Sequence, residues 1–146
     1  MSRAMKAAPA CEESVEPLLN VVVIFTSVRA TVAALRKAGG LASHLNSRIT
    51  LIVPQVVPYP LSLGEPPVLK AWNERRFRVL ANESPVETSV RIYLCRDRFE
   101  LLPSVLEPRS LVVVGGSKGR WWPRPEKRLA RMLRRAGHEV VVVEAD

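Results

Sequence analysis

The most informative stretch for the fold is Leu111-Val112-Val113-Val114-Gly115-Gly116-Ser117-Lys118-Gly119-Arg120. It opens with four apolar residues, three of them β-branched, which is typical of a short strand covered on both faces in a parallel sheet. The glycines that follow let the backbone turn sharply, because glycine tolerates conformations that other residues avoid. A basic segment with helical periodicity comes next. The stretch therefore predicts a strand, a glycine-rich turn and a helix.

The same alternation of short apolar runs and helical segments extends over the rest of the chain. Strands are expected at 20–25, 48–57, 86–94, 111–114 and 139–144, and helices at about 28–47, 67–81, 98–106 and 124–136. Strands that alternate with helices are joined by right-handed crossovers, which gives a parallel sheet with helices on both faces. The sequence predicts an α/β fold with a five-stranded parallel sheet.

Two local features of this pattern can be compared directly with a structure. Pro54 lies inside the second expected strand and indicates a bend or an edge there, because proline cannot donate a hydrogen bond to a neighbouring strand. The second expected helix has apolar residues that we expect to be buried. They are Val68, Leu69, Trp72, Val79 and Leu80.

Length and composition indicate one globular domain. The chain has 146 residues, of which 47% are hydrophobic and 25% are charged, and a chain of this size can bury a sizeable core. We expect a flexible N-terminal tail at 1–17 and a single domain at 18–146. No apolar run approaches the roughly 20 residues that span a bilayer, and the tail has no signal-peptide core. The expected location is the cytoplasm.

The two cysteines, Cys11 and Cys95, do not form a metal-binding or redox pair by their spacing. We expect both thiols to be reduced, and Cys95 to be a partly buried residue at a strand end. The alternative is a reactive thiol, because Arg96 and Arg98 lie close in sequence and cations stabilise a thiolate. Neither the histidines nor the carboxylates form a recognisable catalytic or metal-binding set, so no catalytic residue and no metal ligand is predicted.

A candidate ligand site lies where strands end and helices begin, since ligands of parallel sheets bind at the carboxyl ends of strands. Glycines before a helix can direct backbone N–H groups at an anion, and neighbouring cations add to the attraction. An ordinary glycine turn is the alternative interpretation. The candidate ligand-binding residues are Thr26, Ser27, Gly116, Ser117, Lys118, Gly119 and Arg120.

The formal charge of +8 is concentrated near the C-terminus. Between Gly115 and Ala136 there are eight basic residues and one acidic residue, Glu126. The basic residues of the last expected helix fall on its solvent side. They are Lys127, Arg128, Arg131, Arg134 and Arg135. This surface is either a solvated helix face or an attraction site for a polyanion such as nucleic acid.

From about Val21 to Val143 the chain resembles the universal stress protein family. The resemblance rests on the opening strand with Thr26-Ser27, the second strand running into prolines, and the Leu111–Arg120 stretch before a basic helix and a valine-rich last strand. It implies a Rossmann-like five-stranded domain, commonly paired into a homodimer through the last strand. It also implies a division between members that bind ATP and members that do not.

The nucleotide-binding members have an Asp at the end of the first strand and, after the fourth, a Gly-x-x-Gly, nine further residues and Gly-Ser or Gly-Thr. Here Thr26 stands at the position of the Asp, while Gly116 and Gly119 match the first glycine pair. The second half falls on Leu129-Ala130, or on Glu126-Lys127 when counted back from the last strand. Glu126 would also compete with a phosphate for the helix N-terminus. The nucleotide motif is therefore degenerate.

These observations predict a non-catalytic cytoplasmic regulatory or stress-response module without a high-affinity ATP site, and a homodimer formed through the last strand. No cofactor is assigned with certainty. One alternative is a nucleotide-binding switch that holds ATP in the Gly115–Arg120 loop. Another is a protein that binds nucleic acid or another polyanion weakly through the basic helix. No membrane partner is expected.

Overall fold

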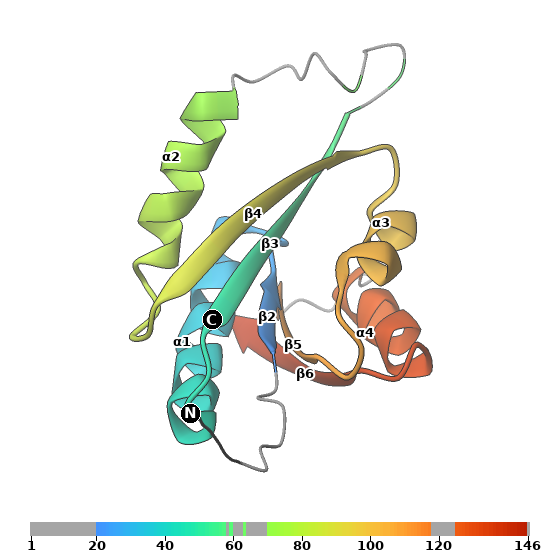
Figure 1. Cartoon of the computed structure of the whole chain (residues 1–146). Helices are drawn as coiled ribbons and strands as arrows, with labels where there is room; N and C mark the ends of the chain where they lie inside the picture. The colour runs from blue at the N-terminus through green and yellow to red at the C-terminus, as the bar shows by residue number, and fades with distance from the viewer. Residues whose placement is uncertain (1–19, 58, 60–62, 64–69, 118–124, 146) are drawn as a thin grey trace, which may run out of the picture.

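The computed structural model describes residues 20–57, 59, 63, 70–117 and 125–145. Five strands and four helices alternate along the chain (Figure 1). They are β2 (Val21–Ile24), α1 (Val28–Leu45), β3 (Ile49–Val56), α2 (Lys70–Ala81), β4 (Thr88–Cys95), α3 (Arg98–Val105), β5 (Leu111–Ser117), α4 (Pro125–Arg135) and β6 (Glu139–Ala145). The predicted α/β alternation is confirmed.

The five strands form one sheet in the order β4-β3-β2-β5-β6, and every neighbouring pair is parallel. The chain therefore runs outward from β2 to β4, crosses back, and continues from β5 to β6. This reversal places the switch point of the sheet between β2 and β5, where Ile24 lies beside Val114. Ligand crevices of such sheets form at this place.

Helices cover both faces of the sheet, with α1 and α2 on one side and α3 and α4 on the other (Figure 1). The first face packs Val21, Val23 and Leu51 against Ala34 and Leu35 of α1. The opposite face has its own apolar cluster. Its buried members are Val22, Ile24, Ile52, Leu102, Leu106, Val112, Val114, Leu129, Ala130, Leu133 and Val140. The β-branched runs are apolar on both faces because both faces are covered.

Side-chain caps and the left-handed residues Asn46 and Gly137 set the helix ends. Ser27 is the N-cap of α1 and accepts a hydrogen bond from the backbone N–H of Ala30, and Asp97 caps α3 through the N–H of Phe99. After α4, Gly137 has a φ of +98°, a conformation that ends helices and favours glycine. These local signals explain why the helix positions could be predicted from sequence.

The position of Pro54 agrees with the expected edge. β2 pairs with β3 only from Ile49 to Ile52, whereas β4 pairs with β3 as far as Val56. Pro54 therefore lies in the part of β3 that has β4 on one side and no described strand on the other. The missing N–H of proline costs no hydrogen bond on an open side.

The expected buried face of α2 is partly wrong. Leu80 is buried, but Trp72 and Val79 are 52% and 65% exposed, while Asn73 and Phe77 are buried instead. The reason is the sheet beneath the helix: the Asn73 amide donates to Gln55 Oε1 at 2.8 Å, and the Phe77 ring packs edge-on against Phe25 at 4.9 Å. These contacts set the rotation of α2. Val68 and Leu69 lie outside the described residues.

Strand β5 is longer than expected. Gly115, Gly116 and Ser117 continue the strand and pair with Val143, Glu144 and Ala145 of β6. The strand therefore extends three residues beyond its expected end at Val114. Across the described ranges, none of the helices has both the length and the apolar character needed to cross a membrane.

Candidate functional site

The candidate site lies at the switch point of the sheet, at the carboxyl ends of β2 and β5. Parallel pairing of these strands brings Thr26 and Ser27 beside Gly115 and Gly116, although they are far apart in sequence. The predicted site residues at the end of β2 therefore lie beside those at the end of β5. Lys118, Gly119 and Arg120 lie outside the described residues, so their place in the site remains a prediction.

Thr26 is held by two hydrogen bonds at the end of β2. Its hydroxyl donates to the Gly115 carbonyl oxygen at 2.8 Å, and its backbone N–H donates to Thr31 Oγ1 at 3.1 Å. Thr31 is fully buried. The Thr26 hydroxyl therefore joins β2 to β5, and its proton is already used within the protein.

Ser27 has a structural role as the N-cap of α1. Its hydroxyl oxygen lies 3.3 Å from the backbone nitrogen of Ala30, which donates to it. The side chain is exposed, and a hydroxyl has a second lone pair that a ligand donor could use. The cap itself is expected to contribute about 1 kcal/mol to the stability of α1.

The space above Gly116 is occupied by a carboxyl group of the protein. A Cβ atom placed on Gly116 would lie 2.4 Å from Glu126 Cγ and 2.8 Å from Glu126 Oε1. Glu126 is in the first turn of α4 and is only 9% exposed. An acidic side chain is favourable at a helix N-terminus because the helix dipole is positive there. A phosphate bound at this end of α4 would therefore compete with the Glu126 carboxyl group for the helix N-terminus.

The backbone of α1 lies directly against the end of β5. A Cβ atom on Gly115 would lie 2.0 Å from the carbonyl oxygen of Ala30, so the backbone of α1 approaches β5 as closely as a glycine allows. Gly115 is therefore required by packing. This role of Gly115 could not be predicted from sequence, because no local signal reveals the approach of α1.

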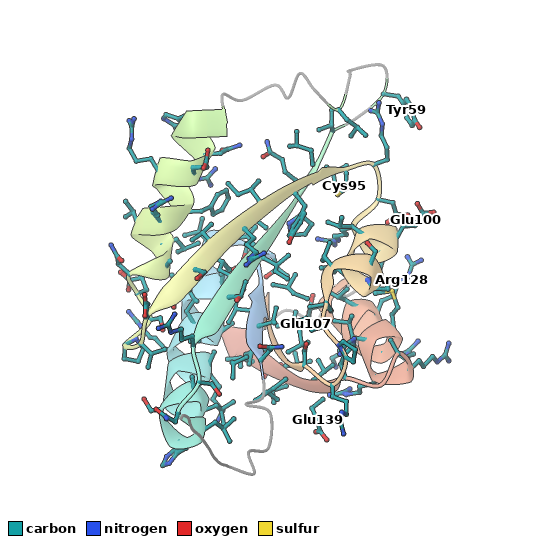
Figure 2. All side chains as sticks on the ribbon, in the orientation of Figure 1. Tyr59, Cys95, Glu100, Glu107, Arg128 and Glu139 are labelled. Carbon is teal, nitrogen blue, oxygen red and sulfur yellow. The ribbon has the colours of Figure 1, made fainter. Side chains whose placement is uncertain are left out.

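Cys95 lies at the carboxyl end of β4 and is 7% exposed (Figure 2). Its sulfur is 3.8 Å from the Gln55 carbonyl oxygen. Burial, and then the negative charge of Asp97, raise the pKa of the thiol, while Arg98 lowers it to a smaller extent. The expectation of a buried strand-end cysteine is confirmed, and the net rise in pKa disfavours the reactive thiolate.

We expect Cys95 to resist alkylation in the folded protein. At pH 7.5, iodoacetamide should label it at least about tenfold more slowly in the native protein than in urea, because the raised pKa and the burial both reduce accessible thiolate. Peptide mapping by mass spectrometry reads this residue separately from Cys11. Equal labelling rates in buffer and in urea would contradict the assignment.

Arg96 points away from the cysteine. Its guanidinium donates to the Val57 carbonyl oxygen at 2.9 Å and lies 4.0 Å from the centroid of the Tyr59 ring. This cation–π contact holds the chain that follows β3 against the end of β4. The contacts of Arg96 could not be predicted from sequence, because Val57 is 39 residues away in the chain.

Within the part of the chain that the structure describes, no cluster of three or more His, Cys, Asp and Glu residues is placed to hold a metal ion. The site therefore consists of hydroxyl groups, backbone groups, two glycines and the Glu126 carboxyl group. Such groups can hold a ligand by hydrogen bonds.

Comparison with solved structures agrees with the geometry of the sheet and its switch point. The fold is similar to that of a protein from the universal stress protein family of Burkholderia pseudomallei, with a TM-score of 0.55 and 20% identity. It is also similar to a universal stress protein in complex with cAMP, with a TM-score of 0.56 and 17% identity. Each comparison covers 88% of this chain and 98% of the other.

The chain has the universal stress protein fold. A universal stress protein from Archaeoglobus fulgidus is similar as well, with a TM-score of 0.52, 13% identity and the same coverage of both chains. No protein-family model matches the sequence, and no curated protein sequence matches it either. The likeness to these solved structures therefore shows the fold alone.

Proposed function

We propose that this chain is a non-catalytic regulatory or stress-response module of universal-stress type, that it acts in the cytoplasm, and that it lacks a high-affinity ATP site. The observation that carries this proposal is the Glu126 carboxyl group above Gly116. A nucleotide phosphate at the N-terminus of α4 would meet this group, and like charges at short distance repel.

The alternative of a nucleotide switch has one point in its favour, since one protein of the same fold was crystallised with cAMP. Thr26 and Ser27 would be the residues nearest to such a ligand in this chain. However, the Thr26 hydroxyl already donates to Gly115, so it can accept a hydrogen bond from a nucleotide but has no proton left to donate to a phosphate. We therefore expect weak nucleotide binding.

A thermal-shift measurement tests this expectation. A micromolar site would stabilise the protein by about 4 kcal/mol at a thousandfold ligand excess, which corresponds to a rise in Tm of roughly 8 °C or more for a chain of this size. We expect millimolar ATP or cAMP to raise Tm by less than about 2 °C.

Glu126→Gln should give a larger ATP-induced shift than the unaltered protein, because it removes the competing charge. The matched control is Glu100→Gln, which neutralises an exposed carboxyl group in the first turn of α3. A large shift in the unaltered protein that Gly119→Val abolishes would favour the nucleotide switch instead.

The proposed module is a homodimer that forms through β6. Within the described residues β6 pairs with β5 alone, so another strand can pair with its outer edge, where the Val140 carbonyl oxygen already accepts a hydrogen bond from Arg134. Val141, Val142 and Val143 are half-buried there. The other edge strand, β4, has the exposed charge of Arg91, a common protection against edge pairing. Two-fold pairing of β6 would satisfy the free edge.

We expect the unaltered protein to sediment as a dimer at tens of micromolar, and Val142→Pro to sediment as a monomer. Proline removes a backbone donor and obstructs strand pairing. Val142→Thr is the matched control, because threonine keeps both the donor and the β-branched shape. A monomer in the unaltered protein, or a dimer that is indifferent to proline, would refute the proposed dimer.

A further inference from the structure

A groove of about 640 Å³ runs between α4 and β6. One wall is a row of basic side chains on α4, and the floor is small and apolar. The lining residues are Lys127, Ala130, Arg131, Arg134, Arg135 and Val142. The four cations are all exposed, whereas Ala130 is 1% exposed. The basic residues therefore form a wall along a concave surface.

The positive charge in this groove is not balanced by its own lining. Glu126, the acidic residue of α4, is turned toward Gly116, while Glu139 and Glu144 lie near the two ends of β6 and do not line the groove. Arg128 also points elsewhere: it lies over the Phe99 ring of α3 at 4.6 Å, on the side of α4 that faces α3 (Figure 2). The charges of Lys127, Arg131 and Arg135 remain available to a ligand, and Arg134 keeps a positive charge that an anion can neutralise although it donates to the Val140 carbonyl oxygen.

The chemistry of the lining favours phosphate groups. Three of the four cations are arginines, whose planar guanidinium groups donate several hydrogen bonds to one phosphate. Among the described residues of the lining there is neither an aromatic ring to stack on a base nor an Asn or Gln to read a base edge. A linear phosphate chain would thus be held by its charges alone, without preference for a sequence.

The groove also lies beside the edge that the proposed dimer uses. Two-fold pairing of β6 with β6 of a second copy, about an axis normal to the sheet, keeps the same face of both sheets on one side. The α4 helices of both copies then flank the β6–β6 interface, and their rows of basic side chains face each other across it. Without an anion these like charges oppose pairing at low ionic strength.

We propose that the groove between α4 and β6 binds a linear phosphate polyanion, and that two copies paired through β6 share one such anion. This inference rests on the proposed dimer. An acidic peptide that bound by strand addition would need the β6 edge and would compete with the second copy. A phosphate chain needs only the side chains and leaves the edge free.

The first measurement is the salt dependence of the protein's affinity for a fluorescent oligo-dT of thirty nucleotides. Long-chain inorganic polyphosphate serves as the competitor. Release of counterions from four contacts predicts about a fiftyfold loss of affinity between 50 and 200 mM KCl. Polyphosphate should displace the oligonucleotide, because both supply the same groups. Polyphosphate that displaces nothing while oligo-dT binds tightly would show that the bases are read and would overturn a site specific only for phosphate.

The groove variant is Lys127→Gln with Arg131→Gln and Arg135→Gln. Arg134 is retained because its guanidinium donates to the Val140 carbonyl oxygen at 2.9 Å and fixes α4 to β6. With one contact left, the same salt change should cost only about threefold in affinity. The matched control is Arg29→Gln with Lys37→Gln and Arg75→Gln, which removes the same charge from exposed positions of α1 and α2. Equal losses in both variants would indicate a general attraction to the whole chain and overturn the site.

Sedimentation equilibrium at 50 mM KCl tests the sharing. Polyphosphate should tighten the dimer of the unaltered protein severalfold, and the groove variant should dimerise more tightly than the unaltered protein without any anion. A dimer that responds to neither change would overturn the shared anion while leaving the proposed dimer intact. A monomer under every condition would refute the dimer itself. Displacement of oligo-dT by poly-glutamate as effective as that by polyphosphate would replace the phosphate assignment with an acidic peptide.

Discussion

Replacing Gly115 by valine is expected to abolish the folded state. A Cβ atom at this position would lie 2.0 Å from the carbonyl oxygen and 2.5 Å from the carbonyl carbon of Ala30, which are backbone atoms of α1 and cannot rotate away. To make room, α1 would have to move off β5, although Ala30 and its helix form much of one core face. The cost should exceed about 4 kcal/mol, a large share of the 5–15 kcal/mol that stabilises a typical domain.

The measurement is the yield of soluble protein followed by urea denaturation. Because the valine variant is expected not to fold, Gly115→Ala provides a second variant, in which the same Cβ contact arises with less bulk. The matched control is Gly40→Ala in the interior of α1, where nothing lies within 4 Å of the new Cβ. That change should raise the free energy of unfolding by about 0.5–1 kcal/mol. A Gly115→Val protein as stable as the unaltered one would contradict the close approach of α1.

Replacing Leu133 by alanine is expected to lower the free energy of unfolding by about 2–5 kcal/mol, and Tm by roughly 5–15 °C. Leu133 is 0% exposed and lies with Leu129 on the apolar face of α4, against Val112 and Val114 of β5. The lost methyl groups leave a cavity that the surrounding helix and sheet cannot close completely. Thermal and chemical denaturation both measure this loss.

The control for this prediction is Arg131→Ala on the same helix. Arg131 is exposed and lines the groove, so its replacement should change the free energy of unfolding by no more than about 0.5 kcal/mol. The pair of variants separates the two faces of α4, one that holds the helix and one that is free for a ligand. A large destabilisation by Arg131→Ala would show that the basic row is part of the structure.

Much of the fold could be predicted from sequence because local periodicity reports burial. The unbroken valines of β2 and β6 indicated strands covered on both faces, and Gly137 marked the end of α4. The rotation of α2 could not be predicted in this way. Trp72 and Val79 are more apolar than Asn73, yet Asn73 is buried because Gln55 of β3 offers its amide a partner. That partner is visible only when the sheet is assembled.

Part of the candidate site could be predicted from sequence, and part depends on tertiary packing. The carboxyl ends of the strands were predicted to hold Thr26 and Gly116, and the structure places both at the switch point. Glu126 could be identified as a competitor for phosphate from its position in the first turn of α4. The packing of α4 on the sheet decides that the Glu126 side chain lies over Gly116. The packing of α1 decides that Ala30 approaches Gly115.

By itself, the sequence determined the fold class, the approximate positions of the strands and helices, and the basic outer face of α4. These properties depend on residues that are close together in the chain, where apolar period, capping residues and charge spacing act directly. Only the tertiary structure decided that Thr26 bonds to Gly115, 89 residues away, and that the basic row lies along a groove beside the free edge of β6. Such contacts depend on strand order and helix packing, which arise from the burial of all the elements together.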